Sequence, residues 1–561
     1  MFASRLLHET PRRLQAALLG LAMIPLAAGA TLHAQTPAND SQDSSIGDTT
    51  AGNLDEVFTG LESKIRRVTL PNGLRLIMMK QDYAPTIACY MKFKAGSSDE
   101  TDASSGIAHM LEHMLFKGTP RVGTRDFGRE RKYLEMAGRF AEKMDAARRE
   151  LGAAKAAGDE AAAKAAAERA SFYAKQLRII QSQVRPLVIE EEDSYLYSLH
   201  GQRGYNAYTS ADFTNYQIEL PANRLEVWAR LESDRMQNSV LRSFYTERNV
   251  VTEERRMRVE NNPRRQLFEK FIGEVYGDHP YGRPVIGPMA SIEFLNHNQA
   301  FEFYRRYYAP NNAVIALVGD VDFEQAEALV RKYFGDMQPR AIPKTPAPEV
   351  ERRPVRVVLR QKGSPTLGLA WFKPPVPDVH DLNLDLLSDI LAGGQETRLY
   401  QRLVTREQLA VNVGAYSGYP GERYTNLFFV EVTPRPGTDE ATMDRIAKIV
   451  QEELDRVVRD GVTAAELTRV RNKQRADFIY RLRANGFVAD LLTNNEQHKG
   501  AYRDLFRYSQ RMESVQPADI QESAREFLRA EHRMTAILLP PPPEESSKKL
   551  EESPTAGEQQ Q

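Results

Sequence analysis

The sequence predicts an α+β protein made of two related α/β halves, with a helical hairpin inserted into the first half. Three observations predict this fold. Short β-type runs and helical runs follow one another in a similar order on both sides of a Pro-rich linker at residues 341–354. An Ala-, Lys-, Glu- and Arg-rich stretch at about 129–195 interrupts the first half. We therefore expect an N-terminal domain at 61–340 and a C-terminal domain at 355–540.

Residues 1–34 resemble an export signal. Arg5, Arg12 and Arg13 precede an uncharged apolar run at 14–32, and small-residue cleavage sites follow. The alternative is an uncleaved membrane anchor, since the run is nearly long enough to span a bilayer. We expect a periplasmic or secreted protein with no stable membrane span once the signal is removed. Polar composition predicts a flexible leader at 35–60 and a disordered tail at 541–561.

The first half begins with a β-hairpin. Short strands at about 67–70 and 74–79 flank Pro71-Asn72-Gly73, and an Asn-Gly pair between apolar runs favours a tight turn. Further elements are expected in this order: a strand at 87–94, a β-rich run at 216–220, helices at 222–236 and 246–260, a strand at 313–320, and a helix at 323–334.

The Ala-rich stretch predicts a long antiparallel helical hairpin, with Gly158-Asp159 as the turn. A disordered insert is the alternative, because alanine-rich segments also serve as linkers. Large apolar side chains along the stretch favour packing instead. They are Leu134, Phe140, Leu151, Phe172, Leu177 and Ile180.

The second half repeats the strand and helix pattern after the linker. The expected elements are strands at 355–361 and 366–373, a helix at 381–392, strands at 410–417 and 425–434, helices at 439–459 and 463–483, and a final strand at 534–539. This order suggests a duplicated α+β unit.

Composition excludes several classes of protein. The 75 Lys and Arg residues nearly balance the 76 Asp and Glu residues, so no global field favours nucleic acid. The chain has one cysteine, Cys89, which excludes internal disulfides and a Cys-based zinc site. Metal ligands must therefore come from His, Asp and Glu.

The most informative motif is His109-Met110-Leu111-Glu112-His113. On a helix, residues four apart project from the same face, so both imidazoles suit one zinc ion, and Glu112 lies beside them. The order H-x-x-E-H is the inverted form of a zinc-protease signature. The alternative is a surface helix with two solvated histidines. Apolar neighbours at 106–108 and 114–116 favour the metal site, since buried imidazoles need partners.

A catalytic zinc site needs a third protein ligand. The predicted helix at 246–260 supplies carboxylates at Glu247 and Glu254, which are seven residues apart and so share a face. One could bind the metal while the other supports the site. Acidic helices are common, so the residues alone do not decide whether Glu247 and Glu254 act at the metal site.

The chain resembles the pitrilysin family of inverted zincins, which includes insulin-degrading enzyme and the mitochondrial processing peptidase. The similarity runs from about residue 64 to residue 540. The motifs that resemble the family lie at 109–119, 206–210, 247–254, 307–312, 318–321 and 397–414. The resemblance implies two family-type half-domains and a zinc-dependent endopeptidase with one zinc per chain.

Position by position, the resemblance implies that His109, His113 and Glu254 bind the zinc. Glu112 becomes the general base and Glu247 the supporting carboxylate. The segment Asn206-Ala207-Tyr208 matches the family's edge strand, on which an extended peptide or unfolded protein segment pairs through backbone hydrogen bonds.

Two features depart from the family pattern. The stretch between His113 and Glu254 is unusually long, which matches the hairpin as an insertion. Active members also have an Arg and, seven residues later, a Tyr that stabilise the oxyanion, whereas the matching positions here are Val404 and Val411. Arg402 or Arg406 could replace the Arg if the register slips.

These departures suggest that the chain is the metal-bearing half of a two-chain clamshell whose partner, a second pitrilysin-like chain, supplies the Arg/Tyr pair. The alternatives are a homodimeric peptidase of altered activity and a non-catalytic peptide-binding or assembly subunit with the same fold. A peptidase specialised for one secreted precursor also fits the sequence.

Overall fold

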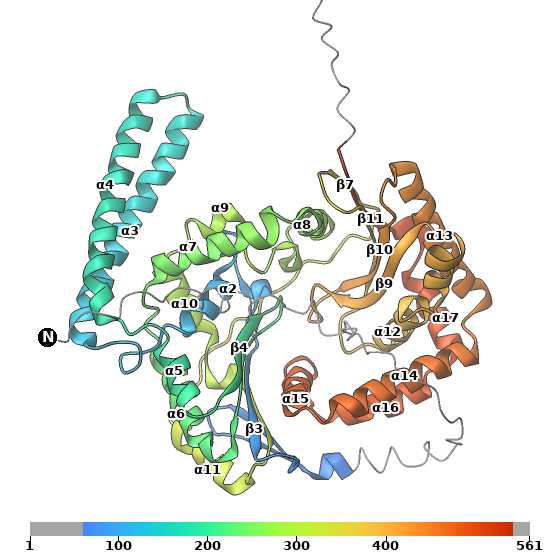
Figure 1. The fold of residues 1–561 in the computed structure, drawn as a ribbon, viewed down its shortest axis with the longest axis horizontal. Helices are drawn as coiled ribbons and strands as arrows, with labels where there is room; N and C mark the ends of the chain where they lie inside the picture. Colours follow the sequence, from blue (N-terminus) through green and yellow to red (C-terminus); the bar gives the residue numbers. More distant parts are fainter. Residues whose placement is uncertain (1–59, 542–561) are drawn as a thin grey trace, which may run out of the picture.

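The computed structural model describes residues 60–541. These residues form two mixed β-sheets covered by helices, with a helical hairpin projecting from the first half (Figure 1). The expected signal at 1–34, the leader up to residue 59 and the tail from residue 542 lie outside the described residues. Within residues 60–541, no helix has the length and apolar character needed to cross a membrane.

The first sheet has six strands in the order β1-β2-β6-β3-β5-β4. The predicted hairpin is confirmed: β1 and β2 pair antiparallel around a turn in which Gly73 has φ 86°. The strand β4, which contains the predicted substrate strand, lies at one edge. The bounds are β1 Ile65–Thr69, β2 Arg75–Lys80, β3 Thr86–Phe93, β4 Arg203–Thr209, β5 Thr214–Pro221 and β6 Ala313–Gly319.

The second sheet has five strands in the order β7-β11-β8-β10-β9. Their bounds are β7 Arg356–Arg360, β8 Thr366–Lys373, β9 Ala410–Tyr419, β10 Asn426–Pro434 and β11 Met534–Leu539. When β1 is set aside, both sheets have the same order and the same directions. In each, one parallel pair (β2 with β6, β7 with β11) is followed by antiparallel neighbours. The predicted duplication of an α+β unit is therefore confirmed.

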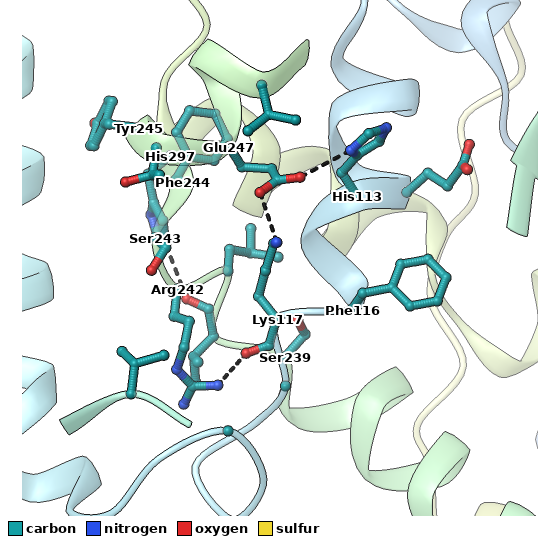
Figure 2. Close-up of a pocket in the computed structure, with 18 of the residues that line it drawn as sticks. His113, Phe116, Lys117, Ser239, Arg242, Ser243, Phe244, Tyr245, Glu247 and His297 are labelled. Atoms are coloured by element: carbon teal, nitrogen blue, oxygen red, sulfur yellow. Dashed lines mark hydrogen bonds and ion pairs between the residues drawn. The ribbon is translucent and has the colours of Figure 1, made fainter. Parts of the chain in front are cut away.

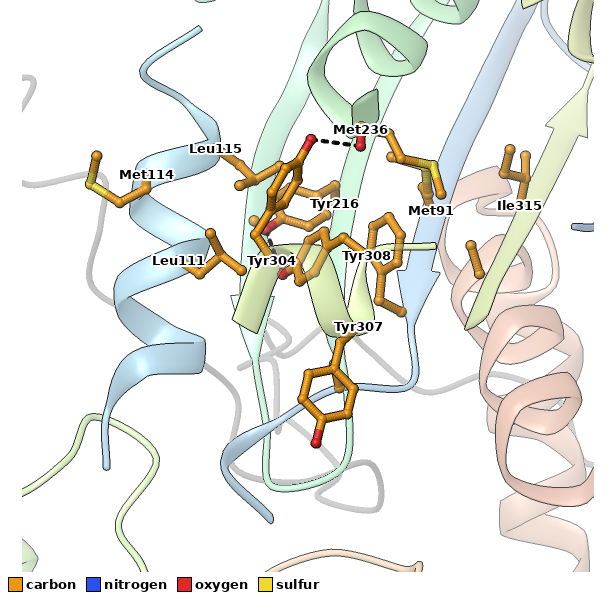
Figure 3. Close-up of a cluster of buried hydrophobic side chains, with 14 of the residues drawn as sticks. Met91, Leu111, Met114, Leu115, Tyr216, Met236, Tyr304, Tyr307, Tyr308 and Ile315 are labelled. Carbon is orange, nitrogen blue, oxygen red and sulfur yellow. Dashed lines mark hydrogen bonds between the residues drawn. The ribbon is translucent and has the colours of Figure 1, made fainter. Parts of the chain in front are cut away.

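Outside the hairpin, the described first half contains a further set of helices. Their bounds are α2 Ile107–Leu115, α5 Glu192–Leu199, α6 Leu225–Asn238, α7 Phe244–Arg255, α8 Pro263–Tyr276, α9 Met289–Ile292, α10 His297–Tyr307 and α11 Phe323–Phe334. The α2 helix, which contains the H-x-x-E-H motif, packs its apolar side chains into the main core, and Leu111 and Leu115 face the tyrosines that include Tyr216 and Tyr304 (Figure 3). This burial fixes the face on which the two histidines lie.

The predicted hairpin consists of α3 (Phe127–Ala156) and α4 (Glu160–Val184), which run antiparallel (Figure 1). Asp159 ends the turn by accepting a hydrogen bond from the backbone of Ala162 at 2.9 Å, as an N-cap residue does. Leu177 and Ile180 are buried as expected. The expectation for Phe172 is wrong: its side chain is 55% exposed, because it lies on the outer face of a two-helix unit that has only one packed side.

The second half contains α12 Val379–Ala392, α13 Glu440–Asp460, α14 Ala464–Arg481, α15 Asn485–Lys499, α16 Asp504–Ser514 and α17 Pro517–Phe527. The last three were not expected from the sequence pattern. One of them, α15, packs Val488, Ala489 and Leu492 on the first sheet. Conversely, α8 of the first half packs Leu267 and Phe271 on the second sheet. Each half thus contributes helical side chains to the core of the other.

Candidate metal centre

The α2 helix is held in place at its N-terminus by a buried carboxylate. Glu100 accepts backbone hydrogen bonds from Gly106 and Ala108, both at 2.8 Å, and so satisfies two N–H groups of the first turn. Gly106 has φ 94°, and a Cβ there would lie 2.6 Å from the backbone oxygen of Ile286. The tight approach requires glycine at the start of the helix.

The predicted ligands meet at one point. His109, His113 and Glu254 offer ligand atoms within 4.8 Å of one another. Glu254 Oε1 lies 3.8 Å from His109 Nε2, and Glu254 Oε2 lies 3.3 Å from His113 Nε2. Ligand atoms bound to a tetrahedral zinc ion are about 3.4 Å apart, so the set fits a zinc ion after small movements. Two imidazoles and one carboxylate are also a zinc-type donor set.

Glu247 supports the site from behind His113. Its carboxylate accepts a 3.0 Å hydrogen bond from His113 Nδ1, which leaves Nε2 facing Glu254. Lys117 Nζ lies 2.7 Å from the other oxygen of Glu247. Figure 2 shows this chain of contacts from Lys117 through Glu247 to His113.

The electrostatics of the three proposed ligands differ. Burial alone would lower the pKa of His113, but its contacts with Glu247 and Glu254 raise it to about 10. Burial lowers the pKa of His109 to about 3, and the nearby His113 adds to this effect. Burial opposes ionisation of Glu254, yet both histidines and Arg258 bring its pKa down to about 2. The site therefore combines an ionised carboxylate with one neutral and one readily protonated imidazole.

Glu112 is 9% exposed and lies between the two histidines on α2. Thr209, the last residue of β4, donates a 2.6 Å hydrogen bond to Glu112 Oε2. Burial raises the pKa of Glu112, while His113 and Thr209 act in the opposite direction. A carboxylate with a raised pKa is better suited to accept a proton near neutral pH.

The predicted substrate strand lies beside Glu112. Asn206, Ala207 and Tyr208 are in β4, which pairs with β5 on one side, and the residues described between 60 and 541 include no strand on its other side. Ala207 is buried, and Asn206 is exposed. The Tyr208 hydroxyl donates to Asp490 of α15 at 2.6 Å, so a helix of the second half holds the strand.

A cavity of about 2610 Å³ contains the site. It is lined by the residues of the metal centre, by β4, and by the base of the α3–α4 hairpin, including Leu134, Ile180 and Val184. The hairpin base is fixed to the α7 side of the site by buried ion pairs, Arg248 with Asp145 at 2.8 Å and Arg242 with Glu130 at 2.6 Å. The hairpin is thus one wall of the cavity.

The positions of the expected oxyanion donors lie in the second half. Val404 is in a π-helical turn, Tyr400–Arg406, and Val411 is on the edge strand β9 with its side chain 51% exposed. Arg402 is bound to Glu407 at 3.1 Å and Glu453 at 2.8 Å, and also to Glu452. Arg402 is therefore already engaged in a cluster of carboxylates.

Sequence reasoning missed three residues of this site. Thr209 contacts Glu112, Lys117 contacts Glu247, and Arg258 Nη1 lies 2.6 Å from Glu254 Oε1. Arg258 follows Glu254 by one helical turn, a spacing that could have revealed it. No local pattern links Thr209 to Glu112, because they meet through tertiary packing.

Comparison with known proteins identifies the type of chain. The insulinase model, peptidase family M16, matches residues 75–140 and 194–289. The model of the M16 inactive domain matches residues 295–474. The first match is interrupted across 141–193, which contains most of the hairpin. The duplicated fold and the H-x-x-E-H helix thus define a chain of the insulinase type. It belongs to peptidase family M16, the pitrilysin family.

Relatives of similar length are named zinc proteases. The zinc protease PqqE of Helicobacter pylori is 25% identical over 488 residues, which cover 85% of this chain and 93% of the relative. An uncharacterised zinc protease of Mycobacterium leprae is 26% identical over 473 residues, 83% of this chain and 90% of the relative.

Solved structures agree with the fold. A protease from Helicobacter pylori matches with a TM-score of 0.69 and 25% identity, over 85% of this chain and 100% of the other. The periplasmic protease PqqL of Escherichia coli matches with a TM-score of 0.61 and 18% identity. That match covers 85% of this chain and 47% of PqqL, so this chain corresponds in fold to about half of PqqL.

Proposed function

We propose that this chain is a zinc-dependent endopeptidase that cleaves peptides or unfolded protein segments. The observation behind the proposal is that His109, His113 and Glu254 converge within 4.8 Å, with Glu112 between the two histidines on α2. One zinc per chain, when bound, would polarise a water molecule and the peptide carbonyl. The names of the zinc-protease relatives support this choice of metal.

The protein groups would then move the protons. Glu112 takes a proton from the attacking water as the new C–O bond forms, and it returns the proton to the leaving amine as the C–N bond breaks. Thr209 holds one Glu112 oxygen, so the other is free to face the water. Glu247 orients His113 through its Nδ1 hydrogen bond.

Substrate would bind as an added strand on β4. The outer edge of Asn206-Ala207-Tyr208 offers backbone groups for pairing with an extended peptide, and the cavity wall includes Asn206 and Ala207. Backbone pairing accepts many sequences but requires an extended chain. It therefore favours short or unfolded substrates over folded proteins.

We further propose that a second pitrilysin-like chain closes the chamber and supplies the Arg and Tyr that Val404 and Val411 replace. The fold match to about half of PqqL supports an arrangement of two such units. The export-type segment at 1–34 supports action in the periplasm or outside the cell. Light scattering of the purified chain, alone and with a candidate partner, would distinguish a heterodimer from a homodimer.

The decisive experiment compares wild type with Glu112→Gln. We expect one zinc per chain in both proteins, measured by atomic emission, and cleavage of unfolded casein or a fluorogenic peptide mixture by the wild type. The variant should lose activity by about a hundredfold or more, because it lacks the proton acceptor. Glu253→Gln, an exposed neighbour of Glu254, is the matched control.

Equal cleavage by wild type and Glu112→Gln would show that the catalytic assignment is wrong. Peptide binding without zinc and without cleavage would instead favour the non-catalytic binding subunit.

A further inference from the structure

Arg258 contacts the metal centre from the turn that follows α7. This turn, Arg256–Glu260, is π-helical rather than α-helical. Arg258 Nη1 lies 2.6 Å from Glu254 Oε1, and the side chain is 25% exposed and lines the metal cavity. Single π-helical turns within helices occur frequently at functional sites, because the wider turn redirects the side chains that follow.

The position of Arg258 relative to the site is suited to catalysis. Arg258 lines the same cavity as His109, Glu112 and Glu254, and its positive charge acts on all three groups. The π-helical turn leads directly into α8, the helix that packs on the second sheet. Arg258 therefore approaches the metal centre from the part of the first half that adjoins the second half.

Peptide hydrolysis is accelerated by a hydrogen-bond donor near the attacked carbonyl oxygen. The attacked carbonyl oxygen becomes an oxyanion, and a guanidinium stabilises that charge more than it stabilises the neutral carbonyl. Val404 and Val411 have no side-chain donor. A guanidinium has five N–H donors and can donate to more than one acceptor at once, Glu254 being one acceptor of Arg258 here.

We propose that Arg258 is a further catalytic residue, which donates to the carbonyl oxygen of the scissile peptide bond. The inference rests on the proposed function. As water adds to the carbonyl carbon, the C=O π bond breaks and its electron pair moves to the oxygen held by Arg258. The water proton passes to Glu112 and then to the leaving amine as the C–N bond breaks. Donors from the proposed partner chain would stabilise the same oxyanion in addition to Arg258.

The test uses the full zinc-loaded chain and three variants. Arg258→Ala should lower kcat by about a hundredfold with little change in KM, because the lost contact forms fully in the transition state. Arg258→Lys should retain part of kcat. The matched control is Arg256→Ala, which removes an exposed arginine of the same turn that pairs with Glu253, and it should behave as wild type.

Two further measurements separate catalysis from support of the metal ligand. Zinc content and zinc affinity should be unchanged in Arg258→Ala, whereas affinity for a phosphonamidate peptide, which mimics the tetrahedral state, should fall in parallel with kcat. Millimolar guanidinium should restore part of the activity of Arg258→Ala but have no such effect on Arg256→Ala.

Full activity of Arg258→Ala would overturn the inference. So would a loss of zinc affinity that matches the loss of activity, because Arg258 would then only hold Glu254. A wild-type chain that binds no zinc and cleaves no peptide would overturn the proposed function itself, and this inference with it. The wild-type measurement therefore distinguishes the two failures.

Discussion

Thr209 donates a 2.6 Å hydrogen bond to Glu112, joining the end of the edge strand β4 to the helix that contains the metal motif. The preceding residue, Tyr208, is bound on the opposite face of the sheet to Asp490 of α15. One dipeptide thus connects the proposed base, the proposed substrate strand and the second half of the chain. Both contacts position the strand relative to the base.

Thr209→Val should reduce kcat by about tenfold, since a hydrogen bond to a charged group contributes roughly 1.5–3 kcal/mol and Glu112 would lose its fixed orientation. Zinc content should not change, because Thr209 contacts no proposed ligand in the described contacts. Thr209→Ser keeps the hydroxyl and should retain most activity. Steady-state kinetics on one peptide measure all three proteins, and equal kcat in Thr209→Val would contradict the positioning role.

Glu247→Gln should weaken zinc binding by about 10- to 100-fold, because a carboxylate behind a metal-bound histidine orients the ring and raises its basicity. Competition with a chromogenic chelator measures the affinity. Glu253→Gln on the same helix should bind zinc as the wild type does, since its side chain is exposed and pairs with Arg256. An equal loss of zinc affinity in Glu247→Gln and Glu253→Gln would contradict the supporting role of Glu247.

Zinc affinity should rise about tenfold for each pH unit between pH 6 and 8. Before zinc binds, His113 has a pKa of about 10 and so holds a proton throughout this range, and zinc must displace that proton. His109 has a pKa of about 3 and is already neutral. Calorimetry in buffers of different ionisation enthalpy should therefore detect release of one proton. Release of two protons, or of none, would disprove this account.

Asp145→Asn should destabilise the hairpin base by about 3 kcal/mol, because it leaves Arg248 buried without its carboxylate partner. The shift of the urea midpoint measures this effect, and trypsin should then cut within α3–α4 more readily. Glu150→Gln removes an exposed pair with Arg169 on the same hairpin and should change stability by less than about 1 kcal/mol. Equal shifts in the two variants would mean that the hairpin base is not braced by α7.

Sequence patterns predicted most of the secondary structure because the causes are local. The Asn72-Gly73 turn, the Gly158-Asp159 turn and the periodicity of the helices depend on neighbouring residues. The same patterns missed α15–α17, which lie between the expected helix at 463–483 and the expected strand at 534–539. They also predicted that Phe172 is packed, whereas its side chain is exposed on the hairpin. The periodicity of a segment predicts that it forms a helix, but it does not predict which element that helix packs against.

By itself, the sequence determined the two histidines and the base, because a helix of known pitch places His109, Glu112 and His113 together without reference to the rest of the chain. It also determined the duplicated order of strands. Only the tertiary structure decided that Glu254 meets the histidines across the hairpin, that Thr209 contacts Glu112, and that Arg258 lies against Glu254. These contacts depend on how separate elements pack, and burial in a shared core, rather than spacing along the chain, sets those distances.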